Sequence, residues 1–208
     1  CSTKQEQQEL LNIVIVGGGA TGIEVAGILS EMKKFVLPND YPDMSSSLMH
    51  IYLIEAGPRL LAGMSEESSA HAEQFLREMG VNILLNKRVV DYRDHKVVLE
   101  DGTEIATRTF IWVSGVTGVT IGNLDASLIG RGGRIKVDSF NRVEGMNNVF
   151  AIGDQCIQLA DENYPNGHPQ LAQVAIQQGE LLAKNLIRME KGQEMKPFHY
   201  RNLGSMAT

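Results

Sequence analysis

Short apolar runs and stretches of helical periodicity alternate along the first part of the chain. Residues 13–16 are four branched apolar residues in a row, a run of strand length. Apolar residues then recur at helical spacing, at Val25, Leu29, Met32 and Val36. A connection that contains proline and serine leads to a second apolar run at 51–54. The pattern predicts a strand-helix-strand unit, the building block of α/β domains.

A second helix is predicted after this unit. Ser65 is placed to cap it, and Glu66 and Glu67 fall in its first turn, where the helix dipole favours acidic side chains. Its predicted buried face consists of Ala72, Phe75, Leu76 and Met79. Gly80 is expected to end the helix, and 81–85 to form the next strand.

The segment that follows predicts a small antiparallel sheet. Short strands are expected at 88–92, 96–100 and 103–107. Asp101-Gly102 is a strong hairpin signal between the last two. A further strand, 109–113, runs into Ser114-Gly115, where small residues let backbone approach a ligand. We therefore expect an α/β fold: a Rossmann-like nucleotide-binding domain built from βαβ units, with a three-stranded β-meander.

The second half of the chain changes character. Glycine and turn residues dominate 117–148. A strand is expected at 149–154, and Pro169 is placed in the first turn of a long helix at 171–189. We divide the chain into a linker at 1–11, a nucleotide-binding domain at 12–116 and a second segment at 117–208.

Composition and charge exclude several classes of protein. The chain has 208 residues, of which 43% are hydrophobic and 21% charged, which is ordinary for a soluble globular protein. A formal net charge of -6 without a run of Lys and Arg disfavours a nucleic-acid partner. Cys1 and Cys156 are too few and too far apart for a disulfide framework, and the isolated histidines predict no metal site. The apolar runs fall short of the about 18 residues that span a bilayer.

The clearest chemical signal lies between the first strand and the first helix. Gly17, Gly19 and Gly22 form a Gly-x-Gly-x-x-Gly pattern in this position. The first glycine permits the tight turn, the second lets backbone approach a pyrophosphate, and the third lets helix and strand pack closely. The helix N-terminus then faces the anion. The loop predicts a dinucleotide site.

A carboxylate, Glu55, closes the second strand. Such a residue accepts hydrogen bonds from both hydroxyls of an adenosine ribose and repels a 2′-phosphate, which favours NADH over NADPH. Glu55 lies 38 residues after Gly17 rather than the usual ~20. The match therefore requires residues 37–49 to form an excursion between helix and strand. The alternative is an ordinary exposed carboxylate at the end of a strand.

Two features of the second half have both a functional and an ordinary interpretation. Gly153-Asp154 at a strand end suits a sugar-alcohol hydroxyl, and it is equally typical of a turn. Gln173 and Gln177 lie four residues apart on one helix face. From the residues alone we favour a solvated face for these two glutamines, since glutamine is mostly exposed.

Taken in order, the motifs of the chain resemble those of the type II NADH dehydrogenases, single-subunit NADH:quinone oxidoreductases of the pyridine nucleotide-disulfide oxidoreductase superfamily. The resemblance covers nearly the whole chain. It rests on the segments 16–27, 54–61, 111–116, 150–154, 172–178 and 204–208. The Ala-Gln-x-Ala-x-Gln-Gln run and the closing Gly-Ser-Met-Ala-Thr are the most particular of these.

The resemblance implies a role for each candidate site residue. It places NADH against the glycine loop and the strand ends, at Gly17, Gly18, Gly19, Thr21, Gly22, Ile23, Glu24, Glu55, Ser114 and Gly115. Within this set, Glu24 would lie beside the nicotinamide carboxamide. The resemblance makes 117–208 the second, incomplete segment of an FAD-binding domain, in which Gly153 and Asp154 would bind FAD, with Asp154 on the ribitol. Gln173 and Gln177 would border the quinone headgroup, which reverses the interpretation from residues alone.

The implied reaction is hydride transfer from NADH to FAD, followed by two-electron reduction of a quinone. The cofactors carry the redox chemistry and the protein aligns them, so no catalytic side chain is expected. The single glycine fingerprint matches the NADH-type copy, and no flavin-type copy precedes it. We therefore expect a fragment that binds NADH at most, holds no stable FAD and is inactive by itself.

The resemblance also implies a location and partners. The parent protein would be peripheral at the cytoplasmic face of a membrane, in contact through regions outside this chain, whereas the fragment would be soluble. The unpaired strands of 117–208 would be mobile or pair with a second copy in a homodimer. Two alternatives stay open: another FAD-dependent NAD(P)H reductase of the superfamily, acting on a disulfide, ferredoxin or thiol, and a non-catalytic NADH-binding module.

Overall fold

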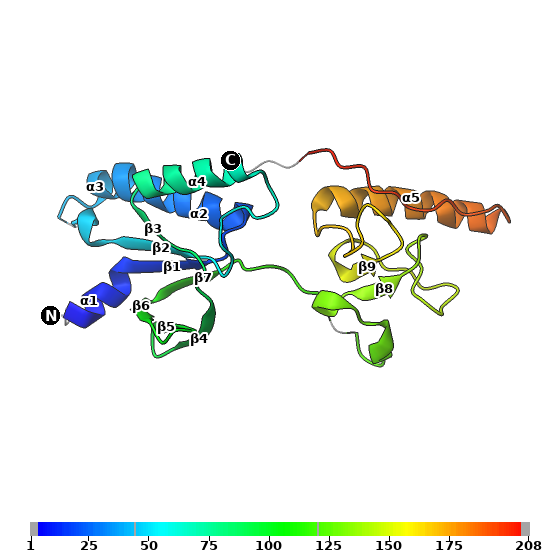
Figure 1. The fold of residues 1–208 in the computed structure, drawn as a ribbon, viewed down its shortest axis with the longest axis horizontal. Helices are drawn as coiled ribbons and strands as arrows, with labels where there is room; N and C mark the ends of the chain where they lie inside the picture. The colour runs from blue at the N-terminus through cyan, green and yellow to red at the C-terminus, as the bar shows by residue number, and fades with distance from the viewer. Residues whose placement is uncertain (1–3, 44, 120, 205–208) are drawn as a thin grey trace. The chain divides into compact units, whose positions relative to one another are not determined.

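A computed structural model describes residues 4–43, 45–119 and 121–204. The chain divides into two compact units, which meet in the sequence between Gly115 and Val116 (Figure 1). Each unit has its own apolar core.

A parallel four-stranded sheet forms the centre of the first unit. Its strands lie in the order β3-β2-β1-β7. Their bounds are Asn12–Val16 for β1, His50–Ile54 for β2, Val81–Leu84 for β3 and Thr109–Trp112 for β7. Val16 is in register with both Ile54 and Trp112, so the strands end at one carboxyl edge. The predicted α/β Rossmann-like class is confirmed.

Helices cover one face of this sheet, and a small second sheet covers the other (Figure 1). The helical layer contains α2 (Ala20–Glu31) and α4 (Glu66–Glu78). Ile13 and Ile15 pack in the helix-side core, whereas Val14 and Val16 pack on the other face. After Asn12 the first strand is apolar, as expected for a strand with both faces buried.

The second sheet is an antiparallel meander between β3 and β7. It consists of β4 (Val89–Arg93), β5 (Lys96–Leu99) and β6 (Glu104–Ala106). Gly102 has a φ of +83° at the turn between the last two strands, which a glycine adopts without strain. The prediction of a three-stranded meander is confirmed, with each strand within a few residues of its expected bounds.

The long connection between α2 and β2 is largely helical. The helix continues as a π-helical turn, η1 (Met32–Val36), and then as α3 (Leu37–Asp40). A 3-10 turn, η2 (Ser46–Leu48), precedes β2. These segments account for the wide spacing between the glycine loop and Glu55.

Two helical predictions in this unit had different outcomes. Ser65 caps α4 as expected, its hydroxyl accepting a hydrogen bond from the Ser68 N–H at 3.1 Å. The predicted buried face of α4 is wrong at Phe75, whose side chain is 63% exposed. Helical spacing placed Phe75 beside Leu76 at the edge of the apolar stripe, and only Leu76 reaches the core.

The residues before β1 form a helix, α1 (Lys4–Leu11), within the segment 1–11 that was assigned to a linker. Glu9 joins this helix to the start of β7. Its carboxylate pairs with the Arg108 guanidinium at 3.2 Å, and its carbonyl accepts a hydrogen bond from the Arg108 N–H at 2.7 Å. The described part of the segment therefore packs on the first unit.

The second unit contains a two-stranded parallel sheet and one long helix. The strands are β8 (Ile135–Val137) and β9 (Cys156–Gln158), and the helix is α5 (Ala172–Glu190). Three short 3-10 turns complete the unit: η3 (Ala126–Leu128), η4 (Arg131–Gly133) and η5 (Gly153–Gln155). An apolar core of this unit consists of Ile135, Val137, Val143, Ala151 and Cys156.

Two predictions for this unit are wrong. Residues 149–154 do not form a strand: Phe150 makes only an isolated bridge to Arg142, and Gly153, at a φ of +64°, turns the chain into η5. Pro169 does not lie in the first turn of the long helix, because Leu171 is still extended and acts as its N-cap. Among the described residues, no helix is long and apolar enough to cross a bilayer.

Candidate functional site

The glycine loop lies at the carboxyl edge of the parallel sheet, where ligands of such sheets bind. The Gly17 N–H donates to the Ile54 carbonyl at 2.9 Å, and the Val113 N–H donates to the Val16 carbonyl at 2.9 Å. The loop is therefore flanked by the ends of β2 and β7. Glu55 follows the end of β2 directly, and Ser114, far away in the sequence, follows the end of β7 after Val113.

Each glycine of the fingerprint meets a different steric demand. A Cβ on Gly17, whose φ is +118°, would lie 2.8 Å from the Val113 carbonyl oxygen. One on Gly22 would lie only 1.9 Å from the Gly17 carbonyl oxygen, so the third glycine lets α2 pack against the turn. A Cβ on Gly19 would meet nothing within 4 Å. This open space would let the pyrophosphate of a dinucleotide approach the protein backbone at Gly19.

The N-terminus of α2 opens directly from this loop. Gly19 is its N-cap and supplies no side-chain cap. The first backbone bond of the helix runs from the Ile23 N–H to the Gly19 carbonyl at 3.1 Å. The N–H groups of the first turn thus lack intrahelical acceptors and carry the positive end of the helix dipole. Together with the space at Gly19, this arrangement fits a pyrophosphate.

Glu55 extends from the end of β2 to the glycine loop. Its carboxylate accepts hydrogen bonds from the N–H groups of Gly18 and Gly57, each at 2.6 Å. An ionised carboxylate offers about four acceptor positions, so each oxygen keeps one for a further donor. Glu55 is therefore not simply an exposed carboxylate at the end of a strand, because both of its oxygens accept hydrogen bonds from backbone N–H groups. Glu55 and the loop form one polar corner beside the helix N-terminus.

The remaining residues predicted for NADH lie on the first turns of α2 and just after β7. Thr21 is exposed on the first turn of α2, whereas Ile23 is buried in the helix-side core. Glu24 is partly buried and lines a groove between α2 and α4. Ser114 and Gly115 are exposed just beyond β7, and Gly115 has a φ of +95°.

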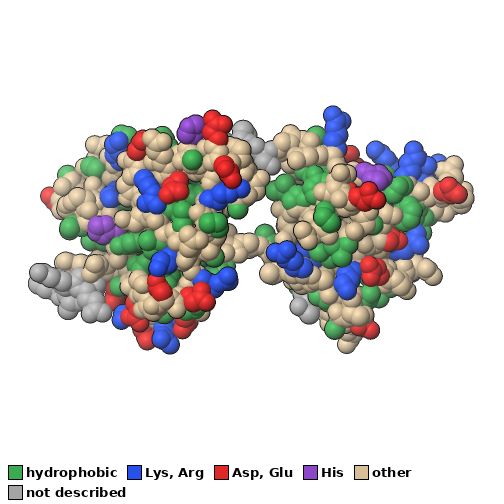
Figure 2. All heavy atoms as spheres, in the orientation of Figure 1, with side chains coloured by type: hydrophobic (Ala, Val, Ile, Leu, Met, Phe, Trp, Pro, Cys, Tyr) green, Lys and Arg blue, Asp and Glu red, His purple; other side chains and the backbone are tan. Residues whose placement is uncertain are grey.

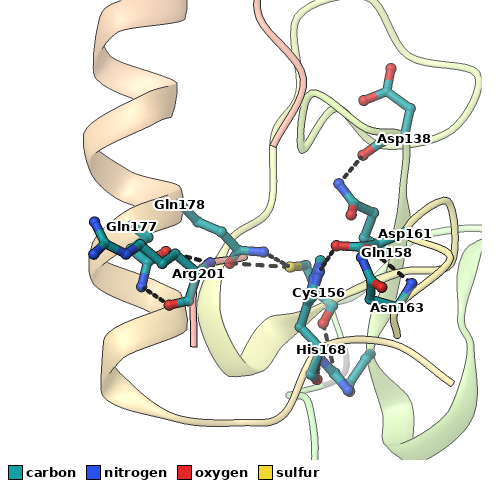
Figure 3. Close-up of polar contacts among 10 residues, drawn as sticks. Asp138, Cys156, Gln158, Asp161, Asn163, His168, Gln177, Gln178 and Arg201 are labelled. Atoms are coloured by element: carbon teal, nitrogen blue, oxygen red, sulfur yellow. Dashed lines mark hydrogen bonds and ion pairs between the residues drawn. The ribbon is translucent and has the colours of Figure 1, made fainter. Parts of the chain in front are cut away.

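In the second unit, the predicted FAD residues lie at η5. Asp154 is exposed, and the N–H of Gly153 donates to the carboxamide oxygen of Gln178 at 2.7 Å. Gln178 is 1% exposed and reaches this turn from α5 (Figure 3). It was not predicted as a site residue. Its position one helical turn after the buried Val174 is the signal that could have identified it.

Cys156 lies beside the same carboxamide. Its thiol is within 3.7 Å of the Gln178 oxygen and 3.8 Å of the Asn141 amide nitrogen. Burial raises the pKa of this thiol. A buried thiol with a raised pKa is a poor nucleophile, which argues against a dithiol reductase that would use Cys156.

The two glutamines predicted for a quinone have backbone partners within the second unit. Gln177 donates to the Arg201 carbonyl at 2.9 Å and accepts from the Arg201 N–H at 3.0 Å. Gln173 donates to the Gly204 carbonyl at 2.9 Å and accepts from the Leu203 N–H at 3.0 Å. Both side chains are partly buried. The solvated-face interpretation is therefore incomplete, since the carboxamides contact a distant segment of the chain.

A buried polar pair lies near the start of α5. His168 Nε2 is 3.0 Å from Asp161 Oδ2, and the two side chains are 1% and 5% exposed (Figure 3). The carbonyl of His168 accepts a hydrogen bond from Arg134 at 3.1 Å. The pair joins the loop before α5 to the β8-β9 sheet, and sequence reasoning did not identify it.

This pair predicts a pH dependence of stability. The hydrogen bond from His168 lowers the pKa of Asp161. The contribution of the pair is therefore complete above the unfolded pKa of about 3.9 and is lost as the pH falls through the lower folded value. We expect Asp161→Asn to flatten the decline of unfolding free energy below about pH 4. Urea titrations at successive pH values measure this slope, and an unchanged slope contradicts the assignment.

No group of His, Cys, Asp and Glu side chains that could hold a metal ion is found in residues 4–43, 45–119 and 121–204. On the visible face of each unit, basic and acidic side chains are interspersed, without a continuous basic patch (Figure 2). The glycine loop, the bare helix N-terminus and Glu55 define the first unit as a dinucleotide-binding α/β domain.

Comparison with known protein families identifies the family of the chain. Residues 2–179 match the family of pyridine nucleotide-disulphide oxidoreductases, and the chain belongs to that family.

Individual relatives agree with this placement. The chain is 32% identical over 206 residues to a type II NADH:quinone oxidoreductase of Haemophilus influenzae, covering 99% of this chain and 46% of the relative. It is 33% identical over 216 residues to the type II NADH:quinone oxidoreductase NdhA of Mycobacterium tuberculosis, covering 98% and 44%. The chain thus spans about half the length of the curated relatives it matches.

The fold also matches solved structures. NDH2 from Plasmodium falciparum in complex with NADH superimposes with a TM-score of 0.86 at 20% identity, covering all of this chain and 57% of that one. A ferredoxin reductase from Rhodopseudomonas palustris matches with a TM-score of 0.62 at 18% identity, covering 94% of this chain and 44% of that one. At these identities the likeness establishes the fold.

Proposed function

We propose that the chain is part of a flavoprotein that oxidises NADH and reduces a quinone. The observation that carries the proposal is the corner formed by the glycine loop, the N-terminus of α2 and Glu55. The curated relatives in bacteria, named as type II NADH:quinone oxidoreductases, support this choice within the family.

In this proposal the first unit binds NADH. The backbone N–H groups after Gly19 bind the pyrophosphate, and Glu55 accepts hydrogen bonds from the adenosine ribose. Glu24 on α2 and the small residues Ser114 and Gly115 after β7 border the nicotinamide. The assigned set also includes Gly17, Gly18, Thr21, Gly22 and Ile23. The first unit corresponds to the nucleotide-binding domain proposed for residues 12–116.

The second unit supplies part of an FAD site, corresponding to the domain segment 117–208. Asp154 is exposed at a turn held by Gln178, and it suits a hydroxyl-rich chain such as ribitol. When bound, the flavin supplies the chemistry: it accepts a hydride from NADH and passes two electrons to the quinone. The residues of this chain orient the partners, and no side chain acts as a nucleophile.

The quinone site is proposed along the first turns of α5, at Gln173 and Gln177. Because quinones of respiratory membranes are lipophilic, we propose that the whole protein is peripheral at the cytoplasmic face of a membrane. A homodimer is also proposed, since β8 and β9 form a sheet of only two strands, to which Ile129 and Val143 add only isolated bridges along β8. Scattering or light-scattering mass in solution tests the dimer, and a monomeric mass contradicts it.

The nucleotide site is tested by Glu55→Gln in this chain. The substitution replaces one carboxylate oxygen of Glu55, which accepts from a backbone N–H, with an NH2 group that cannot accept a hydrogen bond. It also removes the negative charge that repels a 2′-phosphate. We expect the Kd for NADH to rise about tenfold, the order of a lost charge-assisted hydrogen bond. The Kd for NADPH should rise less, so that the preference for NADH shrinks.

Titration of NADH and NADPH by calorimetry measures both constants. Glu100→Gln in the meander is a matched control, because this exposed carboxylate lies on a different sheet from Glu55. The control should bind both nucleotides like the unchanged chain. No NADH binding to the unchanged chain, or equal losses for both nucleotides in Glu55→Gln, contradicts the assignment.

A further inference from the structure

Residues 201–204 run along α5 and are held there by two glutamine side chains. We call these four residues the strap. Gln177 makes both of its contacts with Arg201, and Gln173 contacts Leu203 and Gly204. In each case the carboxamide oxygen accepts from a strap N–H while the carboxamide nitrogen donates to a strap carbonyl. Gln177 thus imitates the pairing of a neighbouring β-strand, because both of its bonds are to one residue. Gln173 instead spans two successive residues where the chain turns at Gly204, whose φ is +96°.

The spacing of the two glutamines matches the repeat of an extended chain. Residues four apart on a helix are separated by about 6.0 Å along its axis. Two residues of extended chain advance by about 6.6 Å. Gln177 and Gln173 accordingly meet strap residues two apart, Arg201 and Leu203, in antiparallel order. The i, i+4 spacing is what allows one helix face to hold a segment of backbone at two successive points.

These contacts also fix how each carboxamide is turned. Rotating a carboxamide by half a turn would place its NH2 against a strap N–H and its oxygen against a strap carbonyl, which removes both hydrogen bonds. In the observed orientation each group retains one N–H and one lone pair. A ligand beside α5 therefore meets carboxamides whose orientation the strap has already set. Figure 3 shows Gln177 paired with Arg201, while Gln178 extends from the same helix to Cys156.

We propose that Gln173 and Gln177 are positioning residues, which hold the strap against α5 and take their own orientation from it. The inference deepens the proposed quinone site and rests on it for its functional meaning. By holding the strap, the two glutamines fix the position of its backbone beside the proposed quinone site. The run Ala-Gln-x-Ala-x-Gln has this spacing because a strap must be held at two points.

Amide hydrogen exchange of this chain tests the proposal without any quinone. Methionine has the length of glutamine but cannot make these bonds, so Gln177→Met should speed exchange of the Arg201 N–H at least tenfold. Gln173→Met should do the same for Leu203, and each variant should affect its own residue more than the other. Lys184→Met is the matched control, since Lys184 is exposed on the same helix, and it should leave both rates unchanged.

A second variant separates hydrogen bonding from packing. Gln177→Glu keeps the shape and the acceptor for the Arg201 N–H, but at neutral pH its carboxylate faces the Arg201 carbonyl. Protonation near the usual glutamate pKa of about 4.3 restores the missing donor. Exchange at Arg201, relative to its intrinsic rate at each pH, should therefore slow as the pH falls through this range. A role in packing alone gives no such pH profile.

The outcomes distinguish this proposal from the proposed function. Unchanged exchange at Arg201 and Leu203 in the double variant Gln173→Met/Gln177→Met overturns the strap, whatever the chain binds. Faster exchange in the single variants, with the pH profile in Gln177→Glu, supports it. Titration of a soluble benzoquinone into the unchanged chain is a separate measurement, and its failure bears only on the quinone site.

Discussion

Gly22→Ala is expected to abolish NADH binding and to destabilise the first unit. The new Cβ would lie 1.9 Å from the Gly17 carbonyl oxygen, a distance that requires α2 or the loop to move. Overpacking of this kind costs about 1–3 kcal/mol of unfolding free energy. The same movement displaces the N–H groups proposed to bind the pyrophosphate, so we expect the Kd for NADH to rise by more than tenfold. Calorimetry measures the Kd, and denaturation followed by the single tryptophan, Trp112 on β7, measures stability.

Two further glycine variants separate binding from stability. A Cβ on Gly19 meets nothing in the structure, so Gly19→Ala should leave stability nearly unchanged while NADH affinity falls. Gly27→Ala, farther along α2 and also without a close neighbour, should bind normally. It should also be stabilised by up to about 1 kcal/mol, the helix propensity difference. Unchanged NADH affinity in both Gly19→Ala and Gly22→Ala would refute the assignment of the loop.

The first unit was largely predictable because its signals are local. A buried parallel strand is apolar throughout, a helix repeats its apolar positions, and Asp101-Gly102 suits a tight hairpin turn. The glycine fingerprint adds a motif whose spacing is imposed by sterics, as the close approach at Gly22 shows. The exposure of Phe75 was not predictable, because the edge of an apolar stripe depends on what packs beside the helix.

The second unit was harder to predict because its order depends on contacts between distant residues. Residues 149–154 are as apolar as a strand, yet Gly153 turns the chain before a ladder forms. The turn is held by Gln178, 25 residues away. Its helical spacing from Val174 indicates that Gln178 is buried, but not that it contacts Gly153. The strap is likewise held by side chains more than 20 residues away. Polar contacts of this range carry no periodic signal.

Within the candidate site, too, some residues carry a local sequence signal and others are placed by contacts with distant parts of the chain. Gly17, Gly19 and Gly22 were predicted from their spacing, and Glu55 was predicted from its position at the end of the second strand, although its distance along the chain from the loop is unusual. The π-helical turn and α3 lengthen the connection without changing where β2 ends. Sheet topology, rather than sequence distance, decides which carboxylate reaches the loop. For Gln173 and Gln177, residue type predicted exposure, and only the structure shows their contacts with Arg201 and Leu203.

His168→Ala is expected to be the most destabilising single change in the second unit. It leaves the Asp161 carboxylate buried with the Asn163 N–H as its remaining hydrogen-bond donor, and it removes a ring that packs against Tyr164, Phe198 and Tyr200. Breaking a buried polar pair and opening a cavity of this size each cost about 3–5 kcal/mol, and the two costs overlap at one side chain. We therefore expect a loss of about 4 kcal/mol or more, enough to unfold this unit at ordinary temperature.

Far-UV circular dichroism during guanidinium titration measures the loss through the helical signal of α5. His199→Ala is the matched control, since His199 is exposed beside Phe198 and should change stability by less than about 0.5 kcal/mol. NADH binding by the first unit should survive in both variants, because Glu55 and the glycine loop lie in a separate core. Equal stability of His168→Ala and His199→Ala would show that the buried pair contributes nothing to folding. Loss of NADH binding together with α5 would show instead that the two units fold as one.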